Sequence, residues 1–176
     1  MVALYNKANK EQLIKQLEKE TFNRLTISFY RYVNINNLDE LRDVLYEKWS
    51  QINILGRVYI AEEGINAQIS IPENKLNEFK KDLNSYKEFQ NMEFKFAVED
   101  KISFYKLIIK IKNEIVAYGI NKNSYDMNKV GKHLNPIEFN KELSKPDSII
   151  VDMRNHYESE IGHFKNAINP DIDRSQ

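Results

Sequence analysis

The chemistry open to this chain is limited first by its lack of thiols, because none of its 176 residues is a cysteine. It can form no disulfide, bind no metal through a thiolate and offer no thiol nucleophile. Its three histidines, His133, His156 and His163, are too scattered and have too few carboxylates beside them to indicate a metal site. His156 with Glu158 and Glu160 is more typical of a solvated turn. We therefore predict no metal.

A second set of residues is suited to binding. Between residues 25 and 71, three segments alternate apolar and polar residues as half-buried strands do, so their polar positions share one face of a sheet. On an open sheet, aromatic rings with amides and an arginine can stack on and hydrogen-bond to unpaired bases. The alternative is that this face packs on a neighbouring domain through its tyrosines. The predicted open face holds Tyr30, Tyr32, Arg57, Tyr59, Asn66 and Gln68.

The charge pattern is compatible with a local basic patch. The 26 basic and 26 acidic residues cancel, which excludes a uniformly basic nucleic-acid coat. Between residues 101 and 132, however, seven lysines face only Glu114 and Asp126. Lysines also protect solvated strand edges, and that alternative is the favoured one when the patch is judged alone. With phosphate contacts included, the RNA-binding candidates are Tyr30, Arg31, Tyr32, Arg57, Tyr59, Asn66, Lys110 and Lys112.

The elements that position these residues follow a recognisable order. Periodicity predicts helices over 8–20, 38–52 (with Asn37 as its cap) and 72–86, and strands over 25–35, 56–61, 65–71 and 92–98. Gly64 suits a tight connection with positive φ between the second and third strands. A hairpin-like pair, 104–112 and 114–118, follows. The order β-α-β-β-α-β with an added hairpin indicates an α+β, ferredoxin-like domain with both helices on one face of an antiparallel sheet.

The remainder of the chain has a different pattern. Residues 121–135 are polar and lack periodicity, as in a linker. A helix over 136–143 and an apolar strand over 148–153 then open an α/β layer that has only about 40 residues to build it, too few for an independent core. We expect an N-terminal helical segment (1–23), a ferredoxin-like domain (24–120), a linker (121–135) and an incomplete α/β domain (136–176). No run is long enough to span a membrane, and a cytoplasmic location is the default.

Two stretches resemble a known family. TISFYRYVNI followed by GRVYIAEEGINAQISIP, and then IIVDMRNHYESEIGHFKNAINP, are similar to the N-terminal half of the rhodanese-domain tRNA uridine hydroxylases. The resemblance implies an acylphosphatase-like domain followed by the beginning of a rhodanese-like domain. It also implies use of molecular oxygen to form 5-hydroxyuridine at the wobble position of tRNA, with the anticodon stem-loop as the recognised partner. No flavin, haem or nucleotide fingerprint is present, so no cofactor is assigned.

The rhodanese resemblance rests on residues with mainly structural roles. Asp152 and Arg154 match the D-x-R at a strand end, Glu158 and Gly162-His163 match the E…GH segment, and residues 167–169 match the AIN that follows. An Asp–Arg pair can brace a loop, and Gly-His can make a tight turn. Residues 164–166 depart from the usual I-P-G. In the family the reactive cysteine lies in a loop downstream of AIN, so we expect it beyond Gln176 and assign no catalytic residue to this chain.

Three functional interpretations are left open. The first is the substrate-recognition part of an oxygen-dependent tRNA hydroxylase, an oxidoreductase. The second is a non-catalytic RNA-binding module, and the third is a general rhodanese-like protein that carries sulfur or docks partners. Acylphosphatase activity has little support, because Arg57 and Asn66 lie on neighbouring strands and not in a glycine-rich phosphate loop.

The absence of cysteine leads to a first prediction. The 176-residue chain alone should not hydroxylate tRNA, because it has no thiol nucleophile. Nucleoside mass spectrometry of tRNA incubated with the chain under oxygen measures this. Formation of 5-hydroxyuridine would contradict the prediction.

Overall fold

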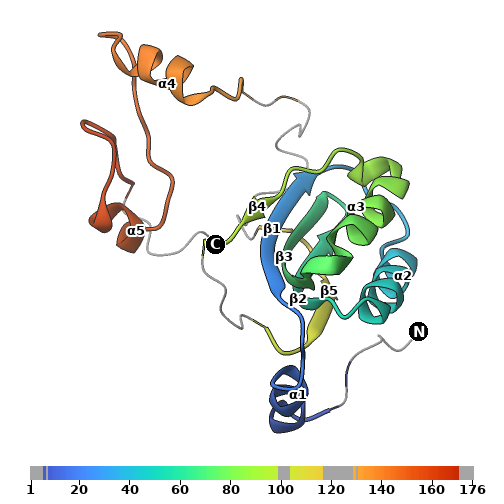
Figure 1. Cartoon of the computed structure of the whole chain (residues 1–176). Helices are drawn as coiled ribbons and strands as arrows, with labels where there is room; N and C mark the ends of the chain where they lie inside the picture. Colours follow the sequence, from blue (N-terminus) through green and yellow to red (C-terminus); the bar gives the residue numbers. More distant parts are fainter. Residues whose placement is uncertain (1–5, 7, 99–103, 117–128, 130, 171–176) are drawn as a thin grey trace. The chain divides into compact units, whose positions relative to one another are not determined.

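The computed structural model describes residues 6, 8–98, 104–116, 129 and 131–170 (Figure 1). The chain divides into two compact units, residues 1–116 and 117–176, which are described separately. The boundary predicted at residue 120 falls within the second unit. Most of the predicted linker, 121–135, lies outside the described residues.

A five-stranded sheet forms the first unit. Its strands are β1 (Arg24–Tyr32), β2 (Leu55–Ala61), β3 (Gly64–Pro72), β4 (Lys95–Phe96) and β5 (Leu107–Ile111), in the order β4-β1-β3-β2-β5. β1 is antiparallel to both β3 and β4, and β2 is antiparallel to β3. β5 adds to the outer edge of β2 in parallel. The first four strands have the ferredoxin-like order, which confirms the predicted fold class.

Two helices cover one face of this sheet. α2 (Leu38–Gln51) follows β1, and α3 (Leu76–Ser85) follows β3 after a short 3-10 turn over Glu73–Lys75 (Figure 1). A second 3-10 turn, Lys87–Phe89, follows α3, and α1 (Lys10–Leu17) precedes the sheet. α1 begins with a capping box in which the Asn9 side chain accepts from the Gln12 amide.

The core lies between this helical layer and the sheet. The inward positions of β3, Ile65, Ala67, Ile69 and Ile71, are fully buried, as the two-residue alternation predicts. Trp49 of α2 packs edge-on against Phe79 of α3, with ring centroids 5.3 Å apart, and Phe29 of β1 contacts both rings. Aromatic packing of this kind holds α2, α3 and β1 together.

Several sequence expectations need correction. Asn37 precedes α2 as expected, but its left-handed backbone (φ 55°) is incompatible with the extended N-cap geometry and its side chain makes no capping hydrogen bond. The strand expected over 92–98 is reduced to β4, because only Lys95 and Phe96 pair with β1. The expected hairpin provides one strand, β5. Residues 114–116 form no strand, and residues 117 and 118 lie outside the described part.

Two glycines allow the strands of the sheet to approach closely. Gly64 begins β3 with a φ of +150°, and a Cβ atom there would lie 2.1 Å from the carbonyl oxygen of Arg31. Gly56 of β2 has a φ of +143°, and a Cβ there would lie 2.3 Å from the carbonyl oxygen of Gln68. Both obstacles are backbone atoms, which cannot move aside as a flexible side chain could. The positive φ predicted for Gly64 is confirmed.

The second unit is built from short elements. α4 (Pro136–Leu143) begins with Pro136 at its first position and a capping box between Asn135 and Glu138. α5 (His156–Ile161) follows a single parallel bridge between Val151 and Ile168. Within the described residues of this unit, no apolar side chain is buried; Ser159 is the buried residue there. Local caps and turns therefore account for most of its visible structure.

The glycine geometry gives a stability prediction. Gly64→Ala should lower the free energy of unfolding of the first unit by at least about 2 kcal/mol, because the added methyl group meets the β1 backbone and φ is strained. Urea unfolding followed by fluorescence of the buried Trp49 measures it. Gly131→Ala is the matched control, since nothing lies within 4 Å of a Cβ at that position. Equal stabilities for the two variants would contradict the close approach.

Candidate nucleic-acid interface

The sheet face opposite α2 and α3 carries most of the predicted binding residues. The antiparallel register places Tyr30 beside Asn66 and Asn66 beside Tyr59, and the parallel pairing places Tyr59 beside Lys110. The neighbouring row across the strands is Ser28, Gln68, Arg57 and Ile108. Adjacent strands lie about 4.8 Å apart, so each row forms a continuous line of side chains. We call this surface the open face; its residues are Ser28, Tyr30, Tyr32, Arg57, Tyr59, Asn66, Gln68, Lys95, Ile108, Lys110 and Lys112.

The charges on the open face have one sign. Arg57 and Lys110 are exposed near its centre and at the β5 edge, and Lys95 is exposed at the β4 edge opposite Ser28. No outward position of the five described strands holds an aspartate or a glutamate. Carboxylates lie only at its margins: Glu20 pairs with Arg24 at the start of β1, and Glu63 accepts from the Ile115 amide. A surface with such an excess of cations attracts polyanions, and the attraction weakens as salt rises.

Tyr30 and Tyr32 are the most accessible aromatic side chains of the open face. Their exposed fractions are 55% and 39%. The two rings lie 6.5 Å apart between centroids and are nearly perpendicular, with an interplanar angle of 79°. They thus form an edge-to-face pair at the carboxyl end of β1, with ring surface open to solvent.

The other end of the row is covered by the chain itself. The Asn66 Nδ2 group donates to the Ile115 carbonyl oxygen at 3.2 Å, and the Ile115 amide donates to Glu63 Oε1 at 2.8 Å. Glu63 and Ile115 are both buried. Nearby, Lys112 Nζ lies 5.5 Å from the centroid of the Tyr59 ring. Residues 112–116, which we call the strap, are therefore fixed against Tyr59 and Asn66.

Arg31 is not part of the open face, because alternation along β1 turns its side chain toward the helical side. Its guanidinium donates to three backbone carbonyl oxygens in the turn region after α3: those of Gln90 at 2.6 Å, Asn91 at 2.9 Å and Glu88 at 3.3 Å. These contacts hold the chain between α3 and β4. The grouping of Arg31 with the neighbouring tyrosines is therefore corrected.

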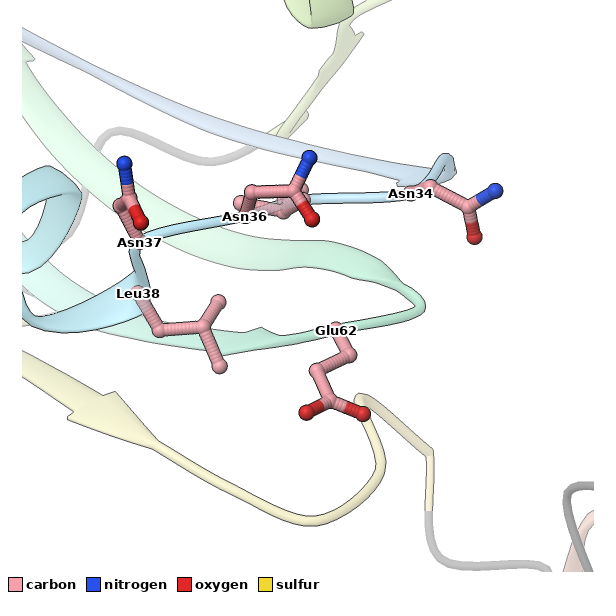
Figure 2. Close-up of a pocket in the computed structure, with 6 residues that line it drawn as sticks. Asn34, Asn36, Asn37, Leu38 and Glu62 are labelled. Carbon is pink, nitrogen blue, oxygen red and sulfur yellow. The ribbon is translucent and has the colours of Figure 1, made fainter.

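A hollow of about 620 Å³ lies beside the loop from β1 to α2, lined by Asn34, Ile35, Asn36, Asn37, Leu38 and Glu62 (Figure 2). In the sequence, the run NINN that forms it predicts only the helix cap at Asn37. Figure 2 shows that the carboxamides of Asn36 and Asn37 point away from the carboxylate of Glu62. Polar groups that do not converge on a common point provide no assignable chemistry.

The rhodanese-like residues form a local brace in the second unit. Arg154 Nη2 donates to Asp152 Oδ2 at 2.6 Å and to the Gly162 carbonyl oxygen at 2.7 Å. The side-chain hydrogen bonds from Arg154, followed by its backbone amide, lower the pKa of Asp152 to about 2. Glu158 completes a capping box with Asn155 at the start of α5. His163 Nδ1 lies 3.0 Å from the Ser159 carbonyl oxygen.

A hollow of about 500 Å³ lies beside this brace, between α4 and the segment 148–154. Phe139 and Phe164 contact each other at its wall, with ring centroids 5.1 Å apart. In the part of the chain that the structure describes, no group of three or more histidines, cysteines or carboxylates could hold a metal ion. Across the same residues, no helix has both the length and the apolarity to cross a bilayer.

The Asp152 brace gives a pH prediction. Because its pKa is lowered, the ion pair with Arg154 is intact above the ordinary carboxyl range and is lost as pH falls toward about 2. In the Arg154→Ala variant the pKa of Asp152 should rise toward the ordinary value of about 3.9. Carboxyl carbon NMR shifts across an acid titration measure both. A pKa of Asp152 that is the same in both proteins would contradict the brace.

Comparison with known proteins agrees with this geometry. A family model described as the UPF0176 acylphosphatase-like domain matches residues 24–115, which contain the whole sheet. A solved chain named BlrP1 BLUF aligns with 52% of this chain and 65% of its own length, at 13% identity and a TM-score of 0.38, a likeness too slight to carry an argument.

Curated relatives match nearly the whole chain. A protein named tRNA uridine(34) hydroxylase from Leptospira interrogans is 56% identical over 171 residues, which are 97% of this chain and 47% of the relative. Proteins of the same name from Enterobacter sp. (strain 638) and Hamiltonella defensa are each 43% identical over 170 residues, covering 96% of this chain and 49% and 48% of the relatives. The chain spans about half the length of these relatives. It belongs to the family defined by the UPF0176 acylphosphatase-like domain.

Proposed function

We propose that this chain is the tRNA-recognising part of a tRNA uridine hydroxylase and that its open face contacts the anticodon stem-loop. The observation that carries the proposal is the combination of tyrosines and cations on one face of the sheet, where the outward positions of the described strands hold no aspartate or glutamate. Phosphates supply the charge that this face attracts, and unpaired loop bases supply the rings and edges that tyrosine and amide side chains contact. The names of the relatives supply the reaction class.

The chemical step is assigned to no residue of this chain. Oxygen-dependent formation of 5-hydroxyuridine follows from the family resemblance, and this sequence contains no cysteine to act as the reactive thiol. The described residues contribute binding and orientation instead. Arg57, Lys110, Lys112 and Lys95 would contact phosphates, while Tyr30, Tyr32 and Gln68 would contact bases or sugars. A cytoplasmic location, where tRNA is available, stays a prediction.

The two other interpretations differ in measurable ways. A purely RNA-binding module would bind tRNA with the same salt dependence. It would support no turnover when it replaces the corresponding segment of a full-length relative. A sulfur-carrying or protein-docking role would leave the open face without affinity for tRNA. The family membership favours the hydroxylase interpretation over both.

Charge reversal on the open face tests the proposal. Arg57→Glu and Lys110→Glu should each weaken tRNA binding roughly five- to tenfold and lower the slope of log affinity against log salt by about one. Fluorescence anisotropy with a labelled tRNA transcript at several salt concentrations measures both quantities. Lys81→Glu is the matched control, because Lys81 is an exposed lysine of α3 on the helical side of the unit.

Two outcomes would contradict the proposal. The first is a wild-type chain that binds tRNA no more tightly than an acidic control protein at low salt. The second is a loss of affinity in Lys81→Glu as large as the loss in the open-face variants, since the attraction would then reflect total charge and not this surface.

A further inference from the structure

We infer that the open face has two functionally different halves: Tyr30 and Tyr32 form a stacking site for unpaired RNA bases, whereas Tyr59 and Asn66 anchor the strap. This inference rests on the proposed function, because it names the part of the open face that reads the loop. It assigns different roles to four residues that strand alternation alone treats as equivalent.

The stacking half is defined by exposure and spacing. Tyr30 and Tyr32 are two residues apart on one strand, so their backbones are separated by about 6.7 Å along β1. Because the two rings are nearly perpendicular, they can receive two bases that are splayed apart, as in an unpaired loop, but not two parallel bases of a continuous stack. Tyr30 is 55% exposed, whereas the side chain of Tyr59 is only partly exposed. The ring surface available for a base is therefore concentrated on β1.

Polar side chains lie beside these rings. Gln68 of β3 pairs with Ser28, which is two residues before Tyr30 on β1. Arg57 of β2 pairs with Gln68 on the other side of β3. Both side chains are exposed. A glutamine amide can hydrogen-bond to a base edge, and an arginine can bind a phosphate or stack on a second base. This half of the open face thus combines stacking, edge recognition and charge.

The anchoring half uses its polar groups within the protein. The Asn66 carboxamide holds the carbonyl oxygen of Ile115, and the carboxylate of Glu63 holds the amide of the same residue. The N–H and C=O groups of Ile115 are thus both hydrogen-bonded, and its side chain is buried. Together these contacts hold the strap in place. Lys112 lies over the Tyr59 ring. A base that stacked on this side of the Tyr59 ring would have to displace Lys112.

This division makes the site selective for unpaired bases. In an RNA duplex the bases are stacked on one another and their faces are inaccessible, so a duplex can use the cations of the open face but not the Tyr30–Tyr32 pair. Loss of the two rings should therefore weaken binding to a stem-loop and leave binding to a duplex of equal length nearly unchanged.

The experiment compares ring removal at matched positions in the full chain. Binding is measured by anisotropy with an anticodon stem-loop RNA and with a fully paired RNA of equal length. A 2-aminopurine in the loop reports stacking through its fluorescence. Tyr30→Ala and Tyr32→Ala should each weaken stem-loop binding by about tenfold and reduce the 2-aminopurine quenching, whereas Tyr30→Phe should stay within about twofold because it keeps the ring. Tyr105→Ala is the control, since Tyr105 is 38% exposed and its ring contacts Lys10, the first residue of α1.

The outcomes separate this inference from the proposed function. If the wild-type chain binds neither RNA, the proposed function is wrong and the stacking site is wrong with it. If the chain binds tRNA and Arg57→Glu weakens it, but Tyr30→Ala and Tyr32→Ala bind the stem-loop as the wild type does, only the stacking site is overturned. An equal loss for stem-loop and duplex in Tyr30→Ala also overturns it. Fluorescence of the buried Trp49 confirms that each variant is folded.

Discussion

The central strand β3 imposes the constraint on which the first unit depends. It is paired along its length with β1 on one side and β2 on the other, and its isoleucines at alternate positions are fully buried against α2 and α3. A slip of one residue would place those isoleucines in water and polar residues in the core. Gly56 and Gly64 remove the side chains that would block this close packing. The register of the whole sheet is therefore fixed by burial.

That register also determines which side chains lie together on the open face. Because burial fixes which residues of β1, β2 and β3 face inward, it aligns their outward residues across the strands into rows of tyrosine, amide and cationic side chains. The same constraint removes Arg31 from these rows and directs its guanidinium to the carbonyl oxygens after α3. The alternation of inward and outward side chains along each strand thus produces both the packed core and the candidate interface.

The second unit depends on different interactions. Most of its hydrogen bonds join residues close in sequence, in capping boxes and in the Asp152–Arg154 ion pair with its link to the Gly162 carbonyl oxygen. Two longer-range contacts, the Val151–Ile168 bridge and the Phe139–Phe164 ring pair, join its segments. Such contacts shape loops and helix ends but contribute little stability compared with apolar burial. The relatives are about twice as long as this chain, and the alignment with the Leptospira relative extends over 97% of it. The chemistry of the family is accordingly proposed for the whole protein and not for this unit.

The sequence by itself determined the order of helices and strands, the inward positions of β1 and β3 and the composition of the open face, because a two-residue period depends only on neighbouring residues. Only the tertiary structure decided how that face is divided. The contacts of Asn66 and Glu63 with Ile115 join residues about fifty positions apart, and the parallel pairing of β5 with β2, in place of the expected hairpin, likewise joins distant segments. No local pattern encodes such contacts, since they depend on where the folded sheet brings its edges.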